Sequence, residues 1–171
     1  VAVKTVEQQD IQAVHRIRAG LIEQLIAKAN QIRGLASEYG LVAPKELLHL
    51  RRAIPHWLED ADNGLSARFR RLLHGLRHDM ALLDERVSEL DHEIALIARA
   101  DPVARRLQQL RGVGPMIATA LAATVGDVKQ FANGRQMAAS LGLTPKQNSS
   151  GGKERLLGIS KRGDAYLRCL L

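Results

Sequence analysis

Apolar residues recur at helical spacing along the first part of the chain, from Glu7 to about Ser37, and charged residues fill the positions between them. No proline interrupts this segment. The pattern is typical of a long amphipathic helix, which Gly40 is expected to end.

A short second helix is predicted after this break. Pro44 suits its first turn, and the helix is expected to end before Pro55. The segment Asp62–Gly64 then indicates a turn, and Ser66 is expected to be the N-cap residue of the helix that follows.

The segment from Ser66 to Ala100 has the clearest periodicity. Its apolar positions are separated by 3, 4, 4, 3, 4, 3, 4 and 3 residues, which is nearly a strict heptad pattern. Such a helix extends roughly 50 Å, too far for a small domain to cover, so it needs a partner helix. The partner is the Glu7–Ser37 helix, a second copy of the chain, or both. The positions of this heptad stripe are Phe69, Leu72, Leu76, Met80, Leu83, Val87, Leu90, Ile94 and Ile97.

Asp101 and Pro102 are expected to end the long helix, and two shorter helical stretches then flank Gly112, Val113 and Gly114. This is the layout of a helix-hairpin-helix element. Its glycines allow a tight turn, so that backbone amides at the start of the second helix can face a phosphate. The alternative is a plain interhelical turn.

The last part of the chain is expected to form a short helix ending near Leu141 and Gly142, then a loop, then a helix from Tyr166 to Leu171. Gly158 and Gly163 are expected to mark turns. The single cysteine, Cys169, has no partner for an internal disulfide and is expected to be buried.

Composition supports a helical protein with an anionic partner. The chain is 46% hydrophobic but only 3% aromatic, which favours helices, and its net charge is +7. Seven basic and two acidic residues lie from Arg135 onward, whereas seven acidic and two basic residues lie between Asp79 and Asp101. We therefore expect the C-terminal part to bind nucleic acid.

These patterns predict an all-α fold. A long antiparallel helical or coiled-coil arm would span residues 1–102, and a small helical domain with the helix-hairpin-helix-like element would span residues 103–171. No apolar run reaches the roughly 18 residues of a membrane span, and no signal peptide is evident, so we expect a cytoplasmic protein without membrane contact. Because the chain does not begin with methionine and ends inside an apparent helix, we interpret it as a fragment.

The chain contains few candidates for catalysis. His74 and His78 have the spacing of a zinc pair, but the glutamate of a metalloprotease motif is absent and no further ligand is evident, so no metal site is predicted. Ser149 and Ser150 precede two glycines within a basic segment. A serine hydroxyl is a weak nucleophile unless a base, a metal or positive charge activates it, so on chemistry alone this segment is an ordinary loop.

The order of the motifs changes this interpretation. Gly112–Gly114, Leu141–Pro145, the Ser-Gly-Gly-Lys motif at 150–153 and Ser160–Asp164 follow one another here. Over about residues 107–171 the chain resembles the C-terminal domain of the insertion-sequence transposases that combine an acidic RuvC-like nuclease domain with a catalytic serine. This family is also called the bridge-RNA recombinases. The preceding arm is similar to the family's coiled-coil region.

The resemblance implies roles for individual residues. Ser150, with Ser149 as the runner-up, would be the nucleophile that attacks a DNA phosphodiester. Magnesium is expected in the family's acidic domain, which this chain does not contain, and no cofactor is expected in the chain itself. The implied partners are DNA, a guide (bridge) RNA and further copies of the chain. Nucleic-acid binding would use Gly112, Gly114, Lys146, Lys153, Arg155, Lys161, Arg162 and Arg168.

The parent protein is therefore expected to be a transposase or recombinase, whereas the isolated chain is expected to be inactive because it has half an active site. The competing interpretation is a non-catalytic module, in which the arm assembles subunits and the basic domain binds nucleic acid.

Overall fold

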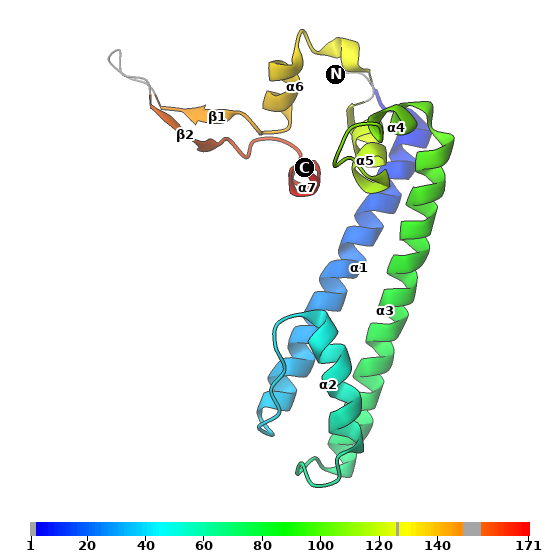
Figure 1. The fold of residues 1–171 in the computed structure, drawn as a ribbon, viewed down its shortest axis with the longest axis vertical. Coiled ribbons are helices and arrows are strands. Elements are labelled where there is room, and N and C mark those ends of the chain that lie inside the picture. Colours follow the sequence, from blue (N-terminus) through cyan, green and yellow to red (C-terminus); the bar gives the residue numbers. More distant parts are fainter. Residues whose placement is uncertain (1–2, 126, 149–154) are drawn as a thin grey trace. The chain divides into compact units, whose positions relative to one another are not determined.

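The computed structural model describes residues 3–125, 127–148 and 155–171 (Figure 1). The described residues are mostly helical, with a single two-stranded antiparallel sheet, which confirms the predicted all-α class. None of the helices in this part of the chain is long and apolar enough to cross a membrane. The elements are α1 (Val6–Ser37), α2 (Leu47–Glu59), α3 (Ala67–Ala100), α4 (Pro102–Leu107), α5 (Pro115–Val125), η1 (Val128–Gln130), α6 (Gly134–Ser140), β1 (Pro145–Gln147), β2 (Leu156–Ile159) and α7 (Ala165–Leu170).

The chain divides into two compact units. The arm unit comprises residues 16–92, and the terminal unit comprises residues 1–15 together with 93–171. Both α1 and α3 contribute to each unit, because the division falls within these helices.

In the arm unit, the partner of α3 is α1 of the same chain. Arg18 forms an ion pair with Asp91 at 2.5 Å, and Lys28 forms one with Asp79 at 3.0 Å. The later residue of α1 therefore pairs with the earlier residue of α3. The two helices are therefore antiparallel, and α2 packs with them. Their shared core contains Leu25, Ala29, Ile32, Leu50, Ile54, Leu65, Phe69, Leu73 and Met80.

The heptad stripe is wrong at one position. Leu72 is 60% exposed, whereas the neighbouring Leu73 is fully buried. The reason is that this end of α3 packs against both α1 and α2, since Leu73 shares a core with Ile32 of α1 and Leu50 of α2. A helix that faces two neighbours buries a wider surface than a heptad seam, and here that surface is centred on Leu73.

The predicted bounds of the second helix were also wrong. α2 begins at Leu47, after Pro44, and continues through Pro55 to Glu59. Proline inside a helix costs about 3 kcal/mol because it removes one backbone hydrogen bond and crowds the preceding turn. Trp57 and Leu58 pack on the arm core beyond the proline, and burial of such side chains outweighs this cost.

Arg70 and Ser66 fix the connection between α2 and α3. Ser66 caps α3 as predicted, since its hydroxyl accepts a hydrogen bond from Phe69 N at 3.1 Å. The guanidinium of Arg70 donates to the backbone oxygens of Trp57 at 3.1 Å and Leu58 at 2.8 Å. Arg70 therefore satisfies carbonyl groups at the end of α2 that no helical amide can reach.

In the terminal unit, α5 and α7 form the main core with Leu121, Val125, Leu141 and Leu167. The region predicted as a loop with a turn at Gly158 instead contains β1 and β2, and Gly158 lies within β2. The strands escaped prediction because they are short and every residue of β1 is exposed, so they show no alternation of apolar and polar residues. Cys169 is exposed, contrary to the prediction.

Candidate nucleic-acid interface

Two glycines hold the Leu141–Pro145 motif against the Ser160–Asp164 motif. Gly142 has φ 73° and Gly163 has φ 140°, values that side-chain-bearing residues rarely adopt. A Cβ on Gly142 would lie 2.8 Å from Arg162 N, and one on Gly163 would lie 2.8 Å from the carbonyl carbon of Leu141. The two backbones therefore pack directly on each other.

Backbone hydrogen bonds complete this junction. Ser160 N donates to Thr144 O at 2.8 Å, and Lys161 N donates to Gly142 O at 3.1 Å. Among the residues that the structure describes, Lys161 alone combines a side chain with a positive φ, at 56°. Such a conformation costs of the order of 1 kcal/mol and persists because the surrounding contacts hold it. Asp164 then caps α7, since its carboxylate accepts from Leu167 N at 3.0 Å.

The junction supports the base of the β1–β2 hairpin. At the far end of the hairpin, Asn148 N donates to Arg155 O at 3.0 Å, so the two chain segments are still paired there. The predicted nucleophile Ser150, its runner-up Ser149 and the predicted phosphate ligand Lys153 belong to the connection between these two residues. They lie outside the described residues.

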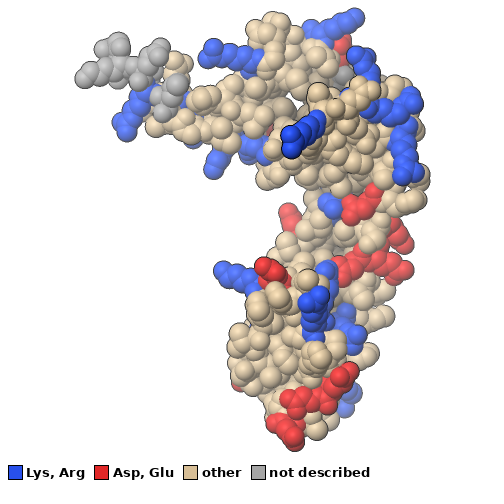
Figure 2. All heavy atoms as spheres, in the orientation of Figure 1, with Lys and Arg blue, Asp and Glu red and all other residues tan. Residues whose placement is uncertain are grey.

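The remaining basic residues of the prediction surround this hairpin. Lys146 is on β1, Arg155 precedes β2, and Lys161 and Arg162 follow it, and all four side chains are exposed. Figure 2 shows Lys and Arg over the terminal unit, while Asp and Glu gather mainly on the arm. The hairpin and its base thus present a cationic surface, which suits phosphate groups.

Arg168 differs from these residues. It is half-buried on α7, and its Nη1 atom is buried with no hydrogen-bond acceptor among the described residues. A buried donor without an acceptor costs about 1–3 kcal/mol.

The turn predicted as a helix-hairpin-helix element joins α4 to α5. Gly112 is exposed with φ 87°, and a Cβ there would meet nothing within 4 Å, so its conformation is what requires glycine. Gly114 is half-buried and its carbonyl accepts from Ala118 N at 3.0 Å. Pro115 is the first residue of α5, where its fixed φ suits the start of a helix.

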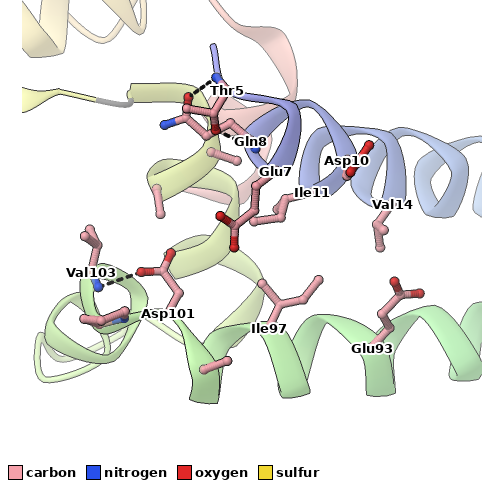
Figure 3. A pocket seen from close by; sticks show the side chains of 14 residues that line it. Thr5, Glu7, Gln8, Asp10, Ile11, Val14, Glu93, Ile97, Asp101 and Val103 are labelled. Atoms are coloured by element: carbon pink, nitrogen blue, oxygen red, sulfur yellow. Dashed lines mark hydrogen bonds between the residues drawn. The ribbon is translucent and has the colours of Figure 1, made fainter.

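A cavity of about 480 Å³ elsewhere in the terminal unit has the opposite charge (Figure 3). Ile11, Val14 and Ile97 contribute apolar surface to it. Four carboxylates also line it, from Glu7, Asp10, Glu93 and Asp101. Acidic walls repel phosphate, so this cavity is not part of a nucleic-acid surface. In the described ranges, no three His, Cys, Asp or Glu side chains are grouped so that they could hold a metal ion.

Comparisons with known proteins find similarity to transposases over this part of the chain. Residues 104–171 match the model of the family described as "Transposase IS116/IS110/IS902 family". This part of the chain is therefore similar to that transposase family.

The similarity extends over the whole chain. The chain is 41% identical to "Probable family 20 transposase" of Pseudomonas aeruginosa, over 100% of the chain and 51% of that protein. It is 42% identical to "Transposase for insertion sequence element IS1111A" of Coxiella burnetii, over 98% of the chain and 46% of that protein. For "Transposase for insertion sequence element IS1328" of Yersinia enterocolitica, the identity is 35%, over 100% of the chain and 50% of that protein.

The predicted relation to insertion-sequence transposases is therefore confirmed, and the chain spans about half the length of the curated relatives that it matches. Within residues 104–171, which match the family model, sequence reasoning found both motifs but missed that Gly142 and Gly163 pack them together. Each motif contains one glycine, and this was the sequence signal that could have indicated a close contact between their backbones. The individual roles of the predicted site residues stay predictions.

Proposed function

We propose that this chain is the strand-exchange part of an insertion-sequence DNA transposase or site-specific recombinase, with Ser150 as its nucleophile. The observation that supports this most is the junction at Gly142 and Gly163. It fixes Lys161 and Arg162 at the base of the same hairpin whose connecting residues include Ser150. Phosphoryl transfer needs cations that are held in place, and the junction holds Lys161 and Arg162 in this way.

The proposed reaction conserves the energy of the phosphodiester bond. The Oγ atom of Ser150 attacks the phosphorus, an Oγ–P bond forms, and the bond from phosphorus to the leaving sugar oxygen breaks. The serine proton passes to a base, and the leaving oxygen takes up a proton. A second sugar hydroxyl then attacks the phosphorus and releases the serine, so no ATP is required.

The basic residues have an electrostatic role in this proposal. Lys146, Lys153, Arg155, Lys161 and Arg162 hold phosphates and offset the negative charge that develops during attack. Gly112 and Gly114 allow the α4–α5 turn to approach the nucleic-acid backbone, where it contributes affinity without reading sequence. Magnesium belongs to the acidic nuclease-like part of the parent, and we assign no step to it in this chain.

We extend the proposal to three kinds of partner. DNA is the substrate, a guide RNA binds the same cationic protein, and further copies of the chain associate through the arm. The nucleic-acid partners are supported by the exposed cations, and self-association is supported by exposed apolar residues such as Leu72 on α3.

The test of the nucleophile uses the full-length parent and a matched pair of variants. Ser150→Ala is expected to abolish strand exchange and any covalent protein–DNA species, with binding nearly unchanged because the cations remain. Ser149→Ala is the control and should have a milder effect. Mass spectrometry of a trapped adduct identifies the linked residue. Linkage at Ser149, or normal recombination by Ser150→Ala, would show that Ser150 is not the nucleophile.

A further inference from the structure

A second cavity of the terminal unit lies between α6 and β1 and has a volume of about 550 Å³. Ligand sites in proteins usually occupy about 300–1,000 Å³. We call it the α6–β1 groove. Its lining residues are Ala132, Asn133, Arg135, Gln136, Ala139, Thr144, Pro145 and Gln147.

The polar groups of this groove are mainly hydrogen-bond donors. The side-chain oxygen of Asn133 already accepts from Gln136 N at 2.9 Å, and that of Gln136 accepts from Ala132 N at 2.6 Å. This reciprocal pair leaves both amide NH₂ groups without an acceptor among the described residues. The guanidinium of Arg135 is exposed and likewise has no ion pair there.

The charge of the groove sets it apart from two other cavities. No carboxylate of the described residues lines it. Four carboxylates line the cavity of Figure 3. A third cavity, on the arm, is lined by Asp79, Glu85 and Glu89 together with Lys28 and Arg86. A site that offers a cation and several N–H donors, without any acid, selects a ligand that is negatively charged and rich in acceptor oxygens.

The apolar part of the groove suits a flat ligand. Ala132 and Ala139 are small, and the apolar ring of Pro145 offers a surface against which a planar base can pack. Gln147, the last residue of β1, also lines the groove, and Asn148 follows it in the sequence. A nucleotide has a phosphate, a planar base and acceptor atoms on the base edge, and the base edge is accessible only when the base is unpaired.

We propose that the α6–β1 groove binds one unpaired nucleotide of a nucleic-acid strand. Arg135 binds its phosphate, and the amides of Asn133, Gln136 and Gln147 donate to acceptor atoms of its base. This inference rests on the proposed function, because Gln147 of the groove precedes the proposed nucleophile Ser150 by three positions in the sequence. It names the strand that this groove holds as single-stranded.

The test uses the 171-residue chain and fluorescence anisotropy. The probes are labelled oligothymidylate and oligouridylate of about 16 nucleotides, and a DNA duplex of equal length. The variants are Gln136→Glu and Gln147→Glu. Glutamate keeps the shape and, at position 136, the oxygen that accepts from Ala132 N, so the local fold is retained. Gln31→Glu, at an exposed position on α1, is the control with the same charge change.

Each groove variant is expected to bind the single-stranded probes about tenfold more weakly, because an N–H donor is replaced by a negative charge. The control should change by less than about twofold. A larger loss for thymidylate than for uridylate would assign the groove to DNA, and the reverse would assign it to RNA.

Three other results would overturn the inference, each in a recognisable way. Groove variants that bind as the Gln31→Glu control does would show that the groove takes no nucleotide. A loss seen only with the duplex would exclude an unpaired ligand. If the unaltered chain bound no probe at all, the proposed nucleic-acid function would fail with it, whereas in the first two cases that function would stand.

Discussion

The Nδ1 atom of His15 lies 2.9 Å from the hydroxyl of Tyr166, although 151 positions separate the two residues. The Nε2 atom of the same imidazole lies 2.9 Å from the hydroxyl of Thr119. His15 is only 2% exposed, and its ring packs edge-on against Tyr166. One buried side chain near the start of the chain thus joins α1, α5 and α7 within the terminal unit.

Replacing this imidazole is expected to destabilise the protein. His15→Leu fills a similar volume but removes the hydrogen bonds from the imidazole to the hydroxyls of Tyr166 and Thr119. The free energy of unfolding should fall by about 2–4 kcal/mol. Urea denaturation measures it, and His92→Leu, at an exposed position on α3, is the control, with an expected change below about 0.5 kcal/mol. Equal stability of the two variants would contradict a role for the buried network.

Gly163→Ala is expected to disrupt the junction between the two motifs. The new Cβ would collide with the backbone at Ser140 and Leu141, and φ 140° is unfavourable for alanine. We expect a loss of about 2–4 kcal/mol in the free energy of unfolding. Gly20→Ala is the matched control, because Gly20 lies within α1 and a Cβ added there would meet no atom within 4 Å. This control should stabilise the helix by about 0.5–1 kcal/mol. The same sign for both variants in urea denaturation would refute the proposed crowding.

Arg168→Met is expected to separate stability from binding. Removing the guanidinium removes the buried Nη1 donor, so the free energy of unfolding should stay the same or rise by up to about 1–3 kcal/mol. Binding to DNA should weaken several-fold, because the resemblance assigns Arg168 to nucleic-acid binding and methionine removes its positive charge. Arg162→Met, at an exposed position, should weaken binding with little change in stability. A marked destabilisation by Arg168→Met, with binding intact, would assign Arg168 a structural role.

Self-association is expected to depend on apolar residues of α3 that the arm core does not use. Leu72→Asp changes a side chain that is 60% exposed, so folding of the chain should be preserved. Sedimentation should show a dimer or larger species for the unaltered chain and a shift toward monomer for this variant. Ala81→Asp adds the same charge at an exposed position of α3 without removing a large apolar group. A monomeric unaltered chain at high micromolar concentration would rule out this mode of assembly.

The isolated chain is expected to bind DNA and structured RNA without cutting either. The proposed contacts are mainly from Lys and Arg to phosphate, so the logarithm of the binding constant should fall linearly with the logarithm of salt concentration. Lys161→Gln should reduce the slope by about one. Gel assays with magnesium should show intact DNA, because this chain supplies only half of the proposed active site. Efficient magnesium-dependent cleavage would contradict that division of the site.

Features set by neighbouring residues could be predicted from the sequence. Ser66 caps α3 because its hydroxyl reaches an amide three residues away, and Asp101 with Pro102 ends α3 because a proline starts the next helix well. The periodicity of α1 and α3 likewise predicted long helices with one apolar side each. The basic character of the hairpin region follows from composition alone. The cap and the helix start depend on interactions within about one helical turn, and the periodicity and the charge are properties of the sequence itself.

Tertiary structure decided the features that depend on distant partners. Helix α2 continues through Pro55 because side chains beyond it find a core, and Leu73 is buried instead of Leu72 because two helices cover that side of α3. The contact of Gly142 with the backbone at Arg162, and that of His15 with Tyr166, join segments that are remote along the chain. Spacing in a sequence records which residues share a face. It does not show which other element packs against that face, because this depends on the packing of the whole unit.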